Sequence, residues 1–333
     1  MPRGGRLLPR SARLASRVAD VIDLHRLEIP LGNRIVTIVI LESKGELLIV
    51  DSAIAGTAKE AVTSFLARSG RTEKDVRYLV VSHADFDHVG GNAELRDVLP
   101  AARFVCHAAD RAHIEDAERM VAERYGEFAG EHGMPSDSEV DRYVLSVTHT
   151  APIDECVAPG DELAVGDARL RVLHLPGHSD GHVALYHEES GLAVIGDAVL
   201  GRALPTVDGG SAFPPTYRNV DDYLGSIDAL RLLAPATMVT GHFPVLRGAE
   251  VTAFLDTSRD FVERLDASIW QALGAAELST PAVVDEAGME VGDWPAEGNG
   301  LAVYPVVGHL ERLEERGLVH RRRDDDGLAR WSR

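Results

Sequence analysis

The sequence predicts an α/β protein built of layered sheets. Two short β-branched apolar runs, IVTIVIL at 35–41 and ELLIV at 46–50, flank Lys44-Gly45, a pair typical of a hairpin turn. Helical spacing over 221–233 separates later runs of the same strand-like kind. Strands interleaved with helices in this way are typical of sheets that are covered by helices.

Composition and charge restrict the class of protein. The chain has 333 residues, 45% of them hydrophobic, and a formal net charge of −19. A surface this acidic repels phosphate groups, so nucleic acid is a poor candidate partner. No apolar run reaches the roughly 20 residues that cross a bilayer, which argues against a membrane protein. The two cysteines, Cys106 and Cys156, favour a cytoplasmic location over a disulfide framework.

Three regions of the chain differ in pattern. Residues 1–19 are rich in arginine and lack an apolar segment, so we expect a disordered N-terminal tail and no secretory signal. Residues 20–255 carry the alternating strands and helices, with a charged, mostly helical insertion over 108–145. Residues 256–333 carry three helical patterns and a terminal hairpin pattern. This last region is predicted to be a small winged-helix-like module.

Four potential metal ligands occur within six residues, directly after an apolar run. They are His83, Asp85, Asp87 and His88, and two glycines follow shortly after them. Imidazole and carboxylate groups are ligands that zinc, iron and manganese accept. A loop at the end of a buried strand holds such side chains on a rigid support. The alternative interpretation, a solvated polar turn, loses weight because three further candidates occur downstream.

Three later apolar runs end in the same manner, with a glycine and then a potential ligand. These ligands are His178, Asp197 and His242. Glycine permits a tight turn at the end of a strand. Each residue alone is a weak signal, but their repetition predicts one metal site assembled from the ends of four strands.

The order and spacing of these residues resemble the metallo-β-lactamase superfamily, whose usual pattern is His-x-His-x-Asp-His, then a histidine, a bridging aspartate and a final histidine. The resemblance covers roughly 23–248. It implies an αββα metallo-β-lactamase sandwich over residues 20–255, the catalytic domain, beside the small winged-helix-like domain at 256–333.

The resemblance also implies two divalent metal ions. Carried over position by position, the first metal is held by His83 and His178, the second by Asp87, His88 and His242, and Asp197 bridges the two. Asp51, after the early hairpin, matches an aspartate that supports the site in this family.

One position departs from the family's pattern. Asp85 stands where the family has its second histidine. A carboxylate oxygen is harder than an imidazole nitrogen, so Asp85 favours iron or manganese, whereas the resemblance implies zinc. Two roles for Asp85 are open. Either it ligates the first metal directly, or it is too short and only orients a water molecule.

The predicted function is metal-dependent hydrolysis of a small-molecule substrate. Two cations lower the pKa of a shared water from about 16 toward 7, which supplies hydroxide at neutral pH. The bond cleaved could be an ester, thioester, lactone or phosphoester. Asp87 and Asp197 are the predicted catalytic carboxylates, because they would hold the cluster and accept the transferred proton.

Two other functions stay open at this point. Asp85 also suits a di-iron protein that binds or reduces oxygen. The C-terminal module also suits a nucleic-acid-binding regulator, but its predicted recognition helix carries three glutamates against two arginines over 311–316. Packing or formation of a homodimer is therefore the favoured role of this module. Among the remaining histidines, His182 is expected to pack or to bind the backbone, and to bind no metal.

Overall fold

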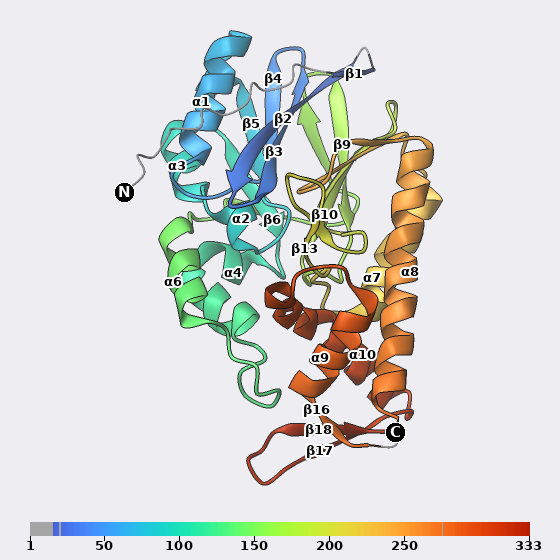
Figure 1. The fold of residues 1–333 in the computed structure, drawn as a ribbon. Helices are drawn as coiled ribbons and strands as arrows, with labels where there is room; N and C mark the ends of the chain where they lie inside the picture. The colour runs from blue at the N-terminus through green and yellow to red at the C-terminus, as the bar shows by residue number, and fades with distance from the viewer. Residues whose placement is uncertain (1–15, 20, 275) are drawn as a thin grey trace.

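Two β-sheets lie face to face with helices on both outer sides, as Figure 1 shows for this computed structural model. The structure describes residues 16–19, 21–274 and 276–333. The predicted α/β class and the αββα sandwich are confirmed. Of the predicted N-terminal tail, residues 1–15 lie outside the described residues, and Ser16–Ala19 form strand β1, which pairs with β2.

The first sheet has seven strands in the order β1-β2-β3-β4-β5-β6-β7. Their bounds are Ser16–Ala19, Ile22–Leu31, Arg34–Ser43, Glu46–Val50, Val76–Val80, Arg103–His107 and Glu155–Val157. The predicted hairpin joins β3 to β4, and Lys44 and Gly45 both have positive φ, 51° and 84°, as its tight turn requires. From β4 to β7 the strands run parallel, so the carboxyl ends of β4, β5 and β6 share one edge of the sheet.

The second sheet has six strands in the order β15-β14-β11-β10-β9-β8. Their bounds are Leu246–Arg247, Thr237–Thr240, Leu192–Gly196, Val183–His187, Ala168–His174 and Glu162–Val165. Neighbouring strands are antiparallel except β11 and β14, which run parallel. A short hairpin, β12 (Leu204–Pro205) and β13 (Ser211–Phe213), stands apart from this sheet.

Alternating side chains of the strands divide the interior into layers. In β3, Val39 and Leu41 face the second sheet, while Ile38 and Ile40 face the helices on the other side. Because both faces of the strand are buried, the run of apolar residues is continuous, with no alternation between apolar and polar positions. Val172 of β9 and Val194 of β11 complete the layer between the sheets.

The helices cover the two outer faces. The first sheet is covered by α1 (Ala58–Ser69), α3 (Asn92–Val98), α4 (Arg111–Glu115), α5 (Ala117–Met120) and α6 (Ser138–Val147), whose buried residues join one core cluster. The second sheet is covered by α7 (Val220–Leu233) and α8 (Ala249–Ala272). The short helix α2 (Phe86–Val89) and a 3₁₀ turn, Glu73–Asp75, flank β5.

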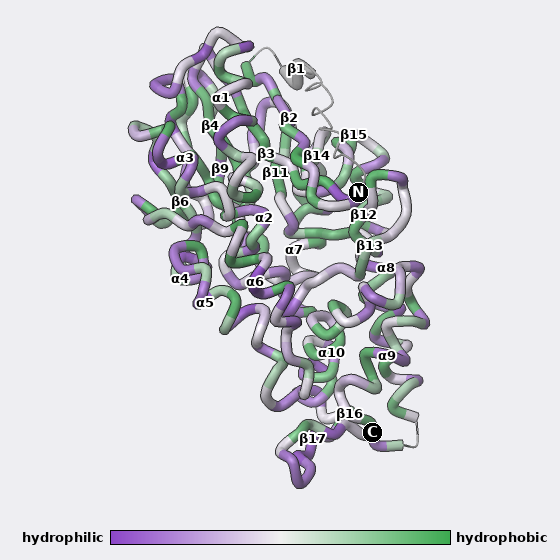
Figure 2. Tube along the Cα trace, turned by 60° about the vertical axis from the view of Figure 1, so that its left-hand side comes forward, coloured by the Kyte–Doolittle hydropathy of each residue, from purple (hydrophilic) through white to green (hydrophobic). Residues whose placement is uncertain are grey.

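The chain after α8 forms a compact helical segment with a small sheet. It contains α9 (Thr280–Val291), the 3₁₀ turn Ala296–Ala302, α10 (Val303–Glu315) and the sheet β16-β18-β17 (Leu278–Ser279, Ala329–Ser332, His320–Arg323). In Figure 2, α10 is largely apolar, whereas the β17 hairpin is strongly hydrophilic. The winged-helix description of this segment stays a prediction.

This segment shares its core with the sandwich. Ile227 of α7, Leu265 of α8, Val306 of α10 and Trp331 of β18 belong to one buried cluster. The predicted domain boundary between residues 255 and 256 falls inside α8, because this helix runs without a break from Ala249 to Ala272. Among the described residues, no helix is both long enough and apolar enough to cross a membrane.

Candidate metal centre

The structure brings all seven predicted ligands together at one edge of the sandwich. His83 follows β5, His178 follows β9, Asp197 follows β11 directly, and His242 follows β14. Their ligand atoms form overlapping groups whose members lie within 4.8 Å of one another: His83, His88 and Asp197; His83, Asp85 and His178; and Asp87, His88 and His242. Residues that follow strand ends in the sequence therefore lie close together in space, and their role as metal ligands stays a prediction.

Two histidines and two carboxylates form what we call the second pocket: Asp87, His88, Asp197 and His242. The Nε2 atom of His242 lies 3.0 Å from Asp197 Oδ2 and 3.7 Å from Asp87 Oδ2. The Nε2 atom of His88 lies 3.6 Å from Asp197 Oδ2. All four residues are buried. Burial opposes a positive charge on the imidazoles, but Asp197 outweighs it and raises the pKa of both histidines.

The orientation of His88 is fixed from behind by Asp51. His88 Nδ1 donates to Asp51 Oδ2 at 2.8 Å, and the same carboxylate accepts from the backbone N–H and the hydroxyl of Ser82. Asp51 has a positive φ of 64°, a conformation that an aspartate tolerates better than most residues. Because Nδ1 of His88 is bound to Asp51, Nε2 is the nitrogen that faces the pocket and that a metal would bind in place of a proton.

The other histidines are oriented in the same way. His242 Nδ1 donates to the Ile35 carbonyl at 2.8 Å, and His178 Nδ1 donates to the Thr216 carbonyl at 3.1 Å. His83 Nδ1 contacts the Ser82 hydroxyl at 2.9 Å, whose own proton goes to Asp51. Burial lowers the pKa of His83, which favours its neutral form. Each ring therefore turns Nε2 toward the centre of the site.

These orientations fit a bound metal at the second pocket. Within the described part of the chain, two acceptors of this pocket, His88 Nε2 and Asp197 Oδ1, are buried without a hydrogen-bond partner, and so is the neighbouring Nε2 of His83, which lies outside it. A buried acceptor without a partner costs free energy, and a cation satisfies several such acceptors at once. Imidazole nitrogen together with carboxylate oxygen is a donor set that divalent transition metals accept.

The first pocket, formed by His83, Asp85 and His178, differs because it contains a cation of the protein itself. Arg124 Nε donates to Asp85 Oδ1 at 2.6 Å, and Arg124 Nη2 donates to Asp85 Oδ2 at 3.0 Å. Burial would raise the pKa of Asp85, but Arg124 outweighs it and holds this pKa well below its ordinary value. Asp85 is therefore an ionised carboxylate in a bidentate ion pair.

Sequence reasoning missed Arg124 and its neighbour Tyr125, whose hydroxyl also donates to Asp85 Oδ1 at 3.0 Å. Both residues come from the predicted insertion, 39 and 40 positions beyond Asp85. A carboxylate that replaces a histidine at a buried position needs a partner of opposite charge. That requirement was the available signal, although it does not say which arginine supplies the charge.

Asp110 and His182 hold the loops of the site together. The Asp110 carboxylate accepts from the backbone N–H of Ala84 and of Gly181 and from the Ser179 hydroxyl, so it links the loops after β5 and β9. His182 Nε2 accepts from the backbone N–H of Asp197 at 3.1 Å. A backbone hydrogen bond of this kind is the role expected for His182 from the sequence.

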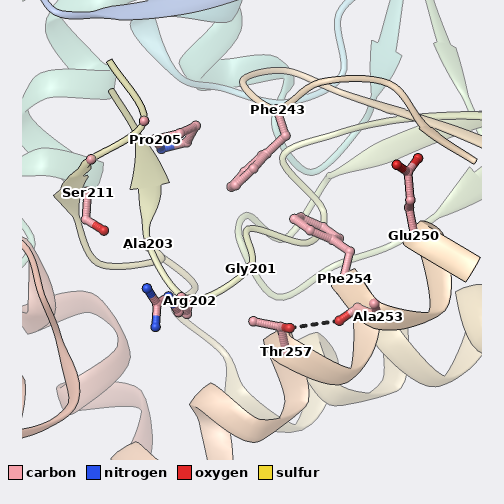
Figure 3. Close-up of a pocket in the computed structure, with 12 residues that line it drawn as sticks. Gly201, Arg202, Ala203, Pro205, Ser211, Phe243, Glu250, Ala253, Phe254 and Thr257 are labelled. Atoms are coloured by element: carbon pink, nitrogen blue, oxygen red, sulfur yellow. Dashed lines mark hydrogen bonds between the residues drawn. The ribbon is translucent and has the colours of Figure 1, made fainter. Parts of the chain in front are cut away.

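A cavity of about 440 Å³ opens between the β12–β13 hairpin and α8. Phe243 and Phe254 pack edge to face within it, with ring centroids 4.9 Å apart, and Figure 3 shows both rings. Phe243 directly follows the predicted ligand His242 in the chain. None of the seven predicted ligands lines this cavity, so it adjoins the metal centre without containing it.

A family comparison decides the identity of the fold. Residues 31–242 match the sequence model of the metallo-β-lactamase superfamily. The chain belongs to this superfamily. This agrees with the family resemblance predicted from the sequence, and the relatives with assigned activities include hydrolases.

The chain matches its curated relatives over only part of their length, about 57% and 67% for two of them. An acyl-coenzyme A thioesterase, MBLAC2, of Gallus gallus is 29% identical over 51% of this chain and 57% of its own. A hydroxyacylglutathione hydrolase of Rhodospirillum rubrum is 26% identical over 67% of both chains.

Solved structures match over nearly the whole chain. A metallo-β-lactamase family protein from Thermus thermophilus has a TM-score of 0.71 at 25% identity and covers 95% of this chain and 99% of its own. A β-lactamase domain protein from Burkholderia ambifaria has a TM-score of 0.75 at 22% identity, with coverage of 98% and 95%. The similarity to the latter concerns the fold alone, and it extends beyond the sandwich into the C-terminal segment.

Proposed function

We propose that this member of the metallo-β-lactamase superfamily is a metal-dependent hydrolase and that it cleaves thioesters at the second pocket. The observation that carries the proposal is the convergence of buried acceptors without partners on one point, which fits a metal-dependent hydrolytic site. Asp87, His88, Asp197 and His242 would hold the metal, for which we propose zinc because of the two imidazole ligands.

Side chains of the protein itself would orient the metal ligands and accept the proton that is transferred. When bound, a divalent metal lowers the pKa of water toward neutrality and polarises a substrate carbonyl. Asp51 holds His88 at a fixed angle, and Asp197 is held through its backbone by His182. Asp197 would hold the metal through Oδ1, which has no hydrogen-bond partner, and we assign proton transfer to the carboxylates of the pocket, Asp87 and Asp197.

The proposed bond type rests on the curated relatives. An acyl-coenzyme A thioesterase and a hydroxyacylglutathione hydrolase both act on an acyl group linked to sulfur. The apolar rings of Phe243 and Phe254 in the adjoining cavity suit an acyl chain. Lactones, other esters and phosphoesters are the competing substrates.

The two alternative functions gain no support from contacts in the structure. The ion pair with Arg124 gives Asp85 a partner other than iron. In the β17 hairpin, Arg322 pairs with Glu277, and Arg321 and Arg323 pair with Glu131, so these charges are satisfied within the protein. A cytoplasmic location and a homodimer stay predictions.

Substrate profiling of the purified protein tests the proposal. We would compare hydrolysis of an acyl-coenzyme A, an S-acylglutathione and an uncharged S-acyl-N-acetylcysteamine with that of an acyl homoserine lactone and bis(p-nitrophenyl) phosphate. The His88→Ala variant serves as the inactive control. Thioesters should give the highest kcat/KM, and the His88→Ala variant should lose at least about 100-fold. A higher kcat/KM for the lactone or the phosphodiester would overturn the proposed bond type.

A further inference from the structure

Asp85 and His178 face each other as two acceptors with a guanidinium between them. His178 Nδ1 donates to the Thr216 carbonyl, so in the neutral ring Nε2 carries a lone pair, and this nitrogen lies 2.8 Å from Asp85 Oδ2. Two acceptors at this distance repel each other unless a donor or a cation lies beside both. Arg124 Nη2 lies 3.0 Å from Asp85 Oδ2 and 3.3 Å from His178 Nε2, and so satisfies both atoms.

The first pocket therefore contains a positive charge that belongs to the chain. We propose that Arg124 takes the place of the first metal ion, so that the protein binds one metal per chain, at the second pocket. This inference rests on the proposed metal site, whose four ligands do not include Asp85, His178 or Arg124.

A metal ion and the guanidinium compete for the same atoms. Ligand distances are about 2.0–2.2 Å, so an ion bound to Asp85 Oδ2 would lie within about 5 Å of Arg124 Nη2. The guanidinium stays charged at every accessible pH, and a divalent cation at that distance in a buried site is strongly repelled. Both oxygens of Asp85 already accept from Arg124, and Oδ1 also accepts from Tyr125.

Arg124 is held in this position from several sides. It lies in a π-helical turn, Val121–Tyr125, a rare element that is frequent at functional sites. Its Nη1 donates to the His178 carbonyl at 3.3 Å, and its own carbonyl accepts from the Tyr304 hydroxyl of α10. The side chains of Arg124 and Asp85 are only 12% and 15% exposed. Moving the guanidinium out would leave Asp85 buried and charged without a partner, which is costly.

Metal content per chain tests the inference without any assay of activity. Metal-free protein would be exposed to excess zinc, freed of unbound ion by gel filtration and analysed for zinc and sulfur. The variants are Arg124→Gln, which removes the charge, and Arg124→Lys, which keeps it. The matched control is Arg119→Gln, since Arg119 lies close by in α5 in an exposed ion pair with Glu123.

The wild type, Arg119→Gln and Arg124→Lys should each hold about one zinc, and Arg124→Gln should hold about two, because Asp85, His83 and His178 then become a free ligand set. Two zinc ions in the wild type would overturn the inference, and this measurement needs no variant to fold. One zinc in a folded Arg124→Gln protein would also overturn it.

The outcome is separable from that of the proposed function. A wild type with one zinc but no thioesterase activity would remove the proposed bond type and leave the role of Arg124 intact. An active thioesterase with two zinc ions would do the reverse. Titration of the metal-free protein with cobalt gives a second readout. The absorption of bound cobalt should stop rising at about one equivalent of cobalt per chain in the wild type, and at about two in Arg124→Gln.

Discussion

At the scale of single residues, the role of a histidine in this site depends on which of its ring nitrogens is hydrogen-bonded to the protein and which one faces the pocket. His242 and His182 are both buried, and both come from loops at the same edge of the sandwich. His242 has its Nδ1 satisfied by a carbonyl and turns Nε2 to the pocket, whereas His182 uses Nε2 for the backbone of Asp197. The first arrangement suits the proposed role of a metal ligand, and the second suits a residue that supports the backbone of the site.

This difference gives opposite predictions for two similar substitutions. His242→Ala should lose most of the bound zinc and nearly all hydrolysis, because it removes a direct ligand of the second pocket. His182→Gln should keep its zinc and most of its activity, since an amide oxygen can accept from the Asp197 N–H. Elemental analysis and kcat/KM of both purified variants check this. Full zinc in His242→Ala, or loss of zinc in a folded His182→Gln, would remove the assignment.

At the scale of elements, the sequence reveals the ends of strands but not what packs over them. The apolar runs before His83, His178, Asp197 and His242 are visible in the sequence, and each run has a ligand placed after a turn. The strands β9, β11 and β14 run in the same direction and end at one edge of the second sheet, and the packing of the two sheets brings the end of β5 beside them. The ion pair of Asp85 with Arg124 depends on how the insertion folds back, which is a long-range contact that periodicity does not encode.

The start of α8 could not be predicted for a similar reason. Residues 249–260 contain two threonines, a serine and two aspartates, which have modest helix propensity. The structure continues the helix through them because Val251, Leu255 and Ser258 are buried against the sandwich. Tertiary packing thus overrides local propensity, and the predicted boundary at 255 lies inside a continuous helix.

Close packing of the loop that carries the ligands makes its glycines sensitive to substitution. A Cβ atom on Gly91, after α2, would lie 2.2 Å from the Ala58 Cβ and 2.4 Å from the Ser52 carbonyl oxygen. Gly91→Ala should therefore lower the free energy of unfolding by about 1–3 kcal/mol. Gly225→Ala is the matched control, because Gly225 lies in helix α7 with open space around its Cα, and should raise it by about 0.5–1 kcal/mol. Urea unfolding measures both, and equal stability of the two variants would contradict the packing argument.

At the scale of the whole molecule, the C-terminal segment and the sandwich form one body. Trp331 of β18 is fully buried, and its indole N–H donates to Thr280 at 2.9 Å. The core that contains it also contains residues of α7 and α8, which cover the second sheet. Loss of packing in the C-terminal segment should therefore also destabilise the metal centre.

Trp331→Ala tests this continuity. The substitution should cost about 3–5 kcal/mol of folding stability, since it empties a large buried volume. Trp270→Ala should cost far less, because the Trp270 side chain is 39% exposed. In a thermal melt of zinc-loaded Trp331→Ala, zinc release and loss of the helical signal should both occur at a lower temperature than in the wild type, and in the same transition. Release of zinc at the wild-type temperature, with an earlier separate transition, would show that the segment unfolds on its own.

The last prediction concerns acid stability at a group remote from the metal. His187 ends strand β10, is 2% exposed, and contacts the Ser190 hydroxyl at 2.7 Å. Burial lowers the pKa of His187 in the folded protein, so the unfolded chain binds a proton more readily than the native one. Its contribution to stability is complete above the unfolded pKa of about 6.5 and is lost as the pH falls toward the folded value. The free energy of unfolding of the wild type should therefore exceed that of His187→Gln by less at pH 5 than at pH 7.5. Taking the difference between the two proteins cancels the titration of the metal ligands, which both share. A difference that stays constant or grows in acid would mean that burial does not disfavour the proton on His187.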